Sequence, residues 1–179
     1  NPDAKVVAFV HAETSTGVRS DAETLCRLAK EAGMLVIMDA VTSLAGIDLQ
    51  ADAWGADVVY SGTQKCLSGL PGISPITFSQ DAVAAIQARK HKVQSWFLDM
   101  NLIMGYWGEG AKRSYHHTAP VNAVYAIHEA LLMLEEEGLE TSIARHKANH
   151  LKLAAGLSKL GLELAVDEAW RLPQLNAVT

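Results

Sequence analysis

The sequence has few cysteines, no long apolar run and no excess of positive charge. Its 179 residues include only Cys26 and Cys66, so a disulfide framework is excluded and a reducing cytoplasm is the default location. No apolar stretch approaches the roughly 18 residues of a membrane helix, which argues against a membrane protein. The net charge of −5 argues against a nucleic-acid-binding protein, because such proteins normally present a basic face.

Two further features are missing. No Gly-x-Gly-x-x-Gly follows a strand-like run, so a dinucleotide-binding domain lacks support. The chain begins Asn-Pro-Asp without a methionine and stops inside a strand-like segment. We therefore expect a piece of a longer protein, and the lack of a targeting segment then says little.

Short apolar runs alternate with helical patterns along the chain. They predict strands at residues 5–10, 34–38, 57–60 and 73–78, helices at 20–33, 81–92, 120–137 and 139–160, and a short helical turn at 48–54. Ser20 and Glu23 fit a capping box at the start of the first helix. Residues 93–118 predict an irregular segment, and residues 162–166 begin new strand structure. The alternation predicts an α/β fold with a parallel or mixed sheet and right-handed crossovers.

Two of the apolar runs end in a single charged side chain. The run at residues 34–38 is followed by Asp39, and the run at 58–60 leads through small polar residues to Lys65. The carboxyl ends of parallel strands meet at one edge of a sheet, so we expect a site across that edge. A lysine and an aspartate so placed are what a pyridoxal phosphate (PLP) enzyme needs.

Five segments carry a family resemblance: His11-Ala-Glu-Thr-Ser-Thr-Gly17, Met38-Asp-Ala-Val-Thr-Ser-Leu-Ala-Gly46, Tyr60-Ser-Gly-Thr-Gln-Lys65, Leu70-Pro-Gly72 and Tyr115-His-His-Thr-Ala-Pro120. In order and spacing the chain resembles the class V, fold-type I PLP aminotransferases, most closely the alanine–glyoxylate and serine–pyruvate group. The resemblance implies a three-layer α/β sandwich with a mainly parallel sheet. It further implies that residues 1–137 are the C-terminal part of the large PLP-binding domain. Residues 138–179 would then be a connecting long helix and the beginning of a small C-terminal α+β domain.

The resemblance implies roles for five residues. Lys65 would hold the cofactor covalently and move the substrate proton, and Asp39 would pair with the pyridine nitrogen. Val41 would pack on one face of the ring, and Thr14 would lie near the ring oxygen. Gln64 would lie near the phosphate, and it separates this chain from cysteine desulfurases, which usually have histidine there. Without the family pattern, Lys65 reads as an exposed lysine, Asp39 as a turn residue and Val41 as a core valine.

Tyr115 and Thr118 match phosphate-contacting residues that the family supplies from the neighbouring subunit. The resemblance therefore implies a homodimer in which these two hydroxyl groups reach the partner's site. His146 and His150 have the spacing of two metal ligands on a helix, but no third ligand is obvious, so we expect no metal.

The implied function is PLP-dependent transamination of alanine or serine, with glyoxylate or pyruvate as the amino acceptor. Another class V enzyme (a cysteine desulfurase, lyase or epimerase) and a non-catalytic relative remain as alternatives. The family's glycine- and serine-rich phosphate turn and its ring-stacking aromatic residue precede the matching region, and its substrate-binding arginine is not matched by Arg171. We therefore expect weak or no turnover from these 179 residues alone.

Overall fold

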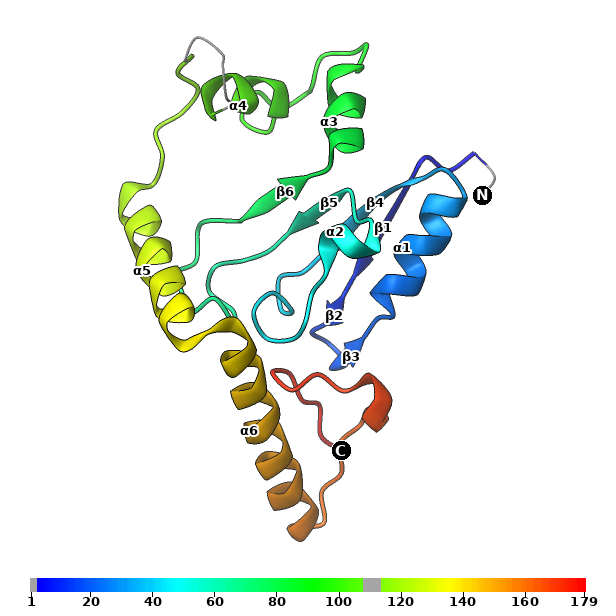
Figure 1. The fold of residues 1–179 in the computed structure, drawn as a ribbon, viewed down its shortest axis with the longest axis vertical. Coiled ribbons are helices and arrows are strands. Elements are labelled where there is room, and N and C mark those ends of the chain that lie inside the picture. The colour runs from blue at the N-terminus through cyan, green and yellow to red at the C-terminus, as the bar shows by residue number, and fades with distance from the viewer. Residues whose placement is uncertain (1–2, 108–113) are drawn as a thin grey trace.

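In a computed structural model, which describes residues 3–107 and 114–179, a sheet lies at the centre of the molecule (Figure 1). It holds β1 (Val6–Val10), β4 (Leu35–Asp39), β5 (Val58–Tyr60) and β6 (Ile76–Phe78), in the order β1-β4-β5-β6. The first three strands are parallel, and β6 is antiparallel to β5. The prediction of an α/β fold on a mainly parallel sheet is confirmed.

One face of the sheet packs against α1 (Ala22–Glu31) and α2 (Ala51–Trp54). Side chains alternate between the faces of a strand, so Val36 and Met38 of β4 point toward α1 and are fully buried. Small residues of α1 allow the close approach of helix and sheet. The core on this side consists of Ala22, Cys26, Ala29, Val36, Met38, Ala40, Ala56 and Val59.

Helix α1 begins one residue later than its capping box predicts. The N-cap is Asp21, whose side chain accepts a hydrogen bond from the Thr24 amide at 3.2 Å. The Ser20 hydroxyl instead donates to the carbonyl of Val10, at 2.7 Å. The capping-box prediction is therefore wrong, because the end of β1 engages the serine and leaves the aspartate to cap.

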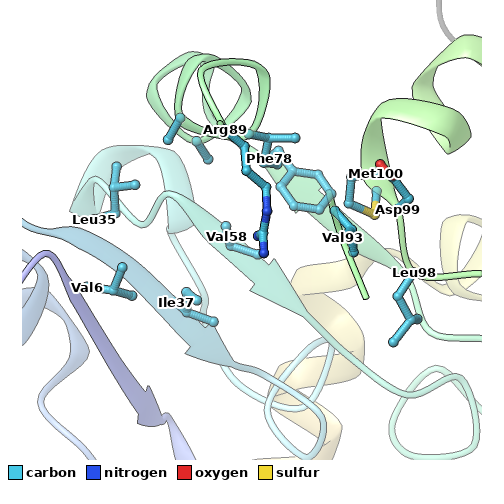
Figure 2. A pocket seen from close by; sticks show the side chains of 13 residues that line it. Val6, Leu35, Ile37, Val58, Phe78, Arg89, Val93, Leu98, Asp99 and Met100 are labelled. Atoms are coloured by element: carbon cyan, nitrogen blue, oxygen red, sulfur yellow. The ribbon is translucent and has the colours of Figure 1, made fainter. Parts of the chain in front are cut away.

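The opposite face of the sheet carries the other set of alternating side chains. At the end of the sheet where the parallel strands begin, these side chains line an apolar groove of about 480 Å³. Helix α3 (Gln80–Gln87) and residues up to Met100 complete the lining. Figure 2 shows Val6, Ile37, Val58 and Phe78 along this groove, with Arg89 extending over it. Asp39 and Tyr60, the last residues of β4 and β5, belong to the same alternating set at the far end.

Helix α4 (Met100–Trp107) lies in the segment predicted to be irregular, so that prediction is wrong for these residues. Its start is capped by Asp99, whose carboxylate accepts from the Asn101 amide at 3.0 Å. None of its side chains is fully buried. Its sequence is apolar nearly throughout and not on one side alone, so the periodic apolar stripe that reveals most helices in a sequence is missing here. The rest of that segment includes residues 108–113, which lie outside the described residues.

Helices α5 (Val121–Glu137) and α6 (Leu139–Lys159) are joined by Gly138. Glycine suits this junction because its φ is +85°, a conformation that other residues avoid. Figure 1 shows α6 running away from the sheet. Among the described residues, no helix is both long and apolar enough to span a membrane.

The C-terminal segment folds back onto a hairpin formed by β2 (Ala12–Glu13) and β3 (Val18–Arg19). After a short 3-10 helix (Glu168–Trp170), Leu172 is fully buried against Ala12 and Ile47. The strand predicted at residues 162–166 is reduced to a single bridge between Leu164 and Val178. The division into domains at residues 137 and 138 stays a prediction.

Candidate active site

Asp39 is held in one orientation at the carboxyl edge of the sheet. Its Oδ1 accepts a hydrogen bond from the Val41 amide at 2.8 Å. Its Oδ2 accepts one from the Tyr60 hydroxyl, also at 2.8 Å. The carboxylate is half-buried, and its two oxygens retain lone pairs for one further partner.

The loop after β5 is folded tightly and leaves Lys65 exposed. Thr63 is fully buried, and its hydroxyl group donates to the carbonyl of Leu70. The amide of Gly69 donates back to the Thr63 carbonyl at 2.8 Å. Ser68 turns the chain with a φ of +59° and donates to the Lys65 carbonyl at 2.9 Å. These bonds fix the backbone on both sides of Lys65, so the direction of its side chain is set by the loop.

Lys65 lines a polar pocket of about 360 Å³. The pocket is lined by Thr14, Thr42, Lys65, Cys66, Ser68, Arg145, His146, Gln174 and Leu175. It therefore brings together two of the predicted site residues, Thr14 and Lys65. The other predicted residues of the same chain, Asp39, Val41 and Gln64, lie outside its described lining.

The charge of Lys65 is not neutralised by any residue that the structure describes. Among the described residues, no carboxylate forms an ion pair with its Nζ. Arg145 lines the same pocket, but its Nη2 lies 2.8 Å from Oε2 of Glu137 and forms an ion pair there. Lys65 is thus the amine of the pocket that is available to a ligand, whereas Arg145 already has a carboxylate partner.

The neighbouring Cys66 is a poor competitor for nucleophilic chemistry. Burial raises the pKa of its thiol, although the charge of Lys65 acts in the opposite direction. The group is therefore a protonated thiol at neutral pH, and the thiolate is the reactive form of cysteine.

Tyr115 and Thr118 hydrogen-bond to each other, with 2.6 Å between the two oxygens. Tyr115 is 70% exposed, and neither residue is part of the described lining of the Lys65 pocket. The structure therefore does not bring them to Lys65 of the same chain.

The two histidines with metal-ligand spacing have separate surroundings. His150 is hydrogen-bonded to the side chain of Asn176, with Nδ1 and Oδ1 2.6 Å apart. His146 lines the Lys65 pocket, and burial, followed by the charge of Arg145, lowers its pKa. No group of three potential metal ligands gathers anywhere in the part of the chain that the structure describes.

Sequence reasoning missed most residues of this region. Tyr60 contacts Asp39, and Thr42, His146 and Gln174 line the pocket. Tyr60 left a signal in the sequence as the last residue of the strand that pairs with the strand of Asp39. Gln174 lies 132 positions from Thr42, to whose carbonyl it donates at 2.8 Å, and no local pattern predicts such a contact.

Residues 1–178 match the sequence model of the family described as aminotransferase class-V. An alanine–glyoxylate aminotransferase from Oryctolagus cuniculus is 42% identical over 172 residues, which is 95% of this chain and 44% of that relative. The chain thus spans less than half the length of this curated relative.

Solved structures show the same likeness. The crystal structure of an alanine–glyoxylate aminotransferase from Nostoc sp. has a TM-score of 0.92 and 47% identity, covering 97% of this chain and 45% of that one. A ureidoglycine–glyoxylate aminotransferase from Bacillus subtilis also has a TM-score of 0.92, with 36% identity over 97% of this chain and 44% of its own. The chain therefore belongs to the class V aminotransferase family.

Proposed function

We propose that the complete protein carrying this chain is a PLP-dependent aminotransferase that moves the amino group of alanine or serine to glyoxylate or pyruvate. The observation that carries the proposal is the exposed Lys65 amine, which has no ion-pair partner among the described residues and lines a polar pocket. Lys65 follows β5, and the neighbouring strand β4 ends in the oriented carboxylate of Asp39. Family membership supports the same chemistry.

The residues present fit PLP by the chemistry of their side chains. Lys65 would hold the coenzyme covalently, and Asp39, an acceptor with lone pairs to spare, suits a protonated pyridine nitrogen. The hydroxyl group of Thr14, in the same pocket as Lys65, suits the ring oxygen. Val41 would contact the ring face, and Gln64 would lie near the phosphate.

When bound, PLP supplies a ring that withdraws electrons from the α-carbon of the amino acid. Lys65 Nζ, as a neutral amine, would take the α-proton of the amino acid and hold it until it is returned. Arginine could not replace it, because a guanidinium stays protonated. The Asp39 carboxylate contributes by favouring a positive charge on the ring nitrogen beside it.

Glyoxylate is the acceptor best supported. Relatives of two kinds, each matched over 95% or more of this chain, are named for different amino donors, alanine and ureidoglycine, but for the same acceptor. The tightly formed Lys65 loop and Asp39 serve the reaction common to both. Donor choice depends on side-chain contacts, so alanine, serine and ureidoglycine are the donors to compare.

We also propose a homodimer and a cytoplasmic location. The mutual hydrogen bond of Tyr115 and Thr118, away from the Lys65 pocket and largely exposed, leaves both hydroxyl groups at a surface where a second subunit can present its phosphate site. Hydroxyl donors suit a phosphate dianion without adding charge. The two free cysteines fit a reducing compartment.

The test is reconstitution of the complete protein with PLP, followed by borohydride reduction and peptide mass spectrometry. We expect a visible absorption band and a reduced adduct on Lys65. Lys65→Ala should lose both, with a fall in alanine–glyoxylate turnover of at least about 100-fold, the lower end for a lost general base. Lys92→Ala, a change at another exposed lysine, is the control and should keep all three.

Three results would contradict the proposal. An adduct that remains in Lys65→Ala would place the coenzyme elsewhere, and no PLP binding by the unchanged protein would favour the non-catalytic relative. Release of sulfide from cysteine, without alanine–glyoxylate turnover, would instead favour the desulfurase alternative.

A further inference from the structure

We infer that Tyr60 is a positioning residue, which holds the Asp39 carboxylate in the orientation that meets the ring nitrogen of PLP. The inference rests on the proposed function and names a residue that the family resemblance did not assign. It follows from the contact between two side chains at the ends of neighbouring strands.

The strand register creates this contact. Asp39 and Tyr60 are paired residues of the parallel strands β4 and β5, so their side chains leave the sheet on the same face. The Tyr60 hydroxyl lies 2.8 Å from Oδ2 of Asp39, and it must be the donor because a carboxylate only accepts. With the Val41 amide on Oδ1, both carboxylate oxygens are fixed, and the plane of the group cannot rotate freely.

The Tyr60 hydroxyl is a permanent donor at neutral pH. Its hydrogen bond to Asp39, together with burial and the negative charge of Asp39, raises the pKa of the phenol above its ordinary value. The Tyr60 hydroxyl is therefore available to donate to Asp39 at neutral pH, and this bond keeps the carboxylate group in one orientation.

The backbone already joins these strand ends, which argues against a purely structural role for the phenol. The amide of Ala40 donates to the Tyr60 carbonyl at 2.8 Å, and the amide of His11 donates to the Asp39 carbonyl at 2.9 Å. The Ser61 hydroxyl adds a further bond to the Ala40 carbonyl at 3.0 Å. The sheet edge is thus held without Tyr60, whereas one oxygen of Asp39 is not.

Ser61→Ala provides a matched control for Tyr60→Phe. Each change removes one hydroxyl hydrogen bond between the same two strand ends, but only Tyr60 touches Asp39. The measurements, on the complete protein, are the dissociation constant for PLP and the thermal midpoint of the apoprotein. A third measurement is the nitrogen chemical shift of ¹⁵N-labelled PLP, which reports the environment of the ring nitrogen.

We expect Tyr60→Phe to raise the dissociation constant for PLP about 3- to 10-fold, which is the range for the loss of one ordinary hydrogen bond, and to shift the ring-nitrogen resonance. Ser61→Ala should leave the dissociation constant for PLP within about 2-fold and the ring-nitrogen resonance unshifted. The two variants should lower the thermal midpoint of the apoprotein by similar amounts. In a protein that already carries Asp39→Ala, adding Tyr60→Phe should have no further effect on PLP binding, because the two residues act as one unit.

Three outcomes would overturn the inference. If Tyr60→Phe binds PLP as tightly as the unchanged protein, with an unshifted nitrogen resonance, the phenol is only a tie between strands. If Tyr60→Phe weakens PLP binding by the same factor in the Asp39→Ala protein as in the unchanged protein, the phenol touches the coenzyme directly. If the unchanged protein binds no PLP, the proposed function fails as well, which is a distinct result from the first two.

Discussion

At the scale of single residues, His11 gives the protein a defined response to acid. The imidazole is 2% exposed and packs edge-on against Trp54, with ring centroids 5.5 Å apart. Burial, with a smaller contribution from the charge of Arg19, lowers the pKa of His11 to about 4. Among the described residues its Nδ1 has no hydrogen-bond partner, so a proton added at that nitrogen would find no acceptor among them.

The pH dependence of stability follows from that shift. The unfolded chain binds a proton at His11 near pH 6.5 and the folded protein only near pH 4, so this contribution to stability is complete above 6.5. It is lost as the pH falls between those values. In urea unfolding, the unchanged protein should lose about 2–3 kcal/mol more between pH 7 and pH 4.5 than His11→Gln does.

The matched control is His91→Gln, which removes an exposed imidazole and should follow the unchanged protein at every pH. The carboxylates titrate alike in all three proteins and cancel in the difference. Equal acid losses in the unchanged protein and His11→Gln would contradict the prediction.

Individual residues also show what a sequence can and cannot reveal. Asp39 and Lys65 could be found because each ends an apolar run and stands inside a family segment. Tyr60 reads as the last residue of a buried strand, because its contact with Asp39 depends on the register of two strands. The sequence pattern favours Ser20 as the cap, whereas Asp21 is the cap in the structure, since both residue types suit the position.

At the scale of elements, the C-terminal segment holds both loops that face the pocket. Gln174 donates to the carbonyl of Thr42, and Arg19 of the β2–β3 hairpin donates to the carbonyl of Ala169 at 3.2 Å. Leu172 lies between these contacts and is fully buried against the hairpin residue Ala12 and against Ile47. The loops carrying Thr14 and Val41 are therefore supported by residues more than 120 positions away, which local sequence patterns cannot indicate.

We therefore expect Leu172→Ala to lower the free energy of unfolding by about 3 kcal/mol, the usual effect of a cavity left by a buried leucine. Amide hydrogen exchange in residues 12–19 and 42–46 should accelerate more than in α5 and α6. Leu160→Ala, which alters a side chain that is 76% exposed, should change the unfolding free energy by less than about 0.5 kcal/mol. If Leu172→Ala stayed within that same limit, the segment would not support the loops.

At the scale of the whole molecule, the order of helices and strands was predictable, because buried strands and amphipathic helices leave patterns of different period. The reversed direction of β6 was not, since an apolar strand reads the same either way. The contacts of Tyr115 and Thr118 with a second subunit stay a prediction. These two residues bond to each other and lie away from the Lys65 pocket, as expected for groups that serve a second subunit.

Subunit complementation tests this arrangement in the complete protein. One variant carries Lys65→Ala, and the other carries Tyr115→Phe together with Thr118→Ala. If the hydroxyl groups act across the interface, a mixed dimer has one site with both defects and one site with none. Co-expressed variants should then recover a substantial part of one site's turnover, although each homodimer alone is nearly inactive.

Recovery would come only from the way in which the two subunits combine, because each chain keeps its own substitutions. If Tyr115 and Thr118 served the Lys65 of their own chain, every site of the mixed dimer would carry a defect and activity would stay at the level of the homodimers. Lys65→Ala co-expressed with Lys65→Arg provides the negative control, since both partners then lack the nucleophile. Recovery in the first mixture but not in the second would establish a site that two copies of the chain build together.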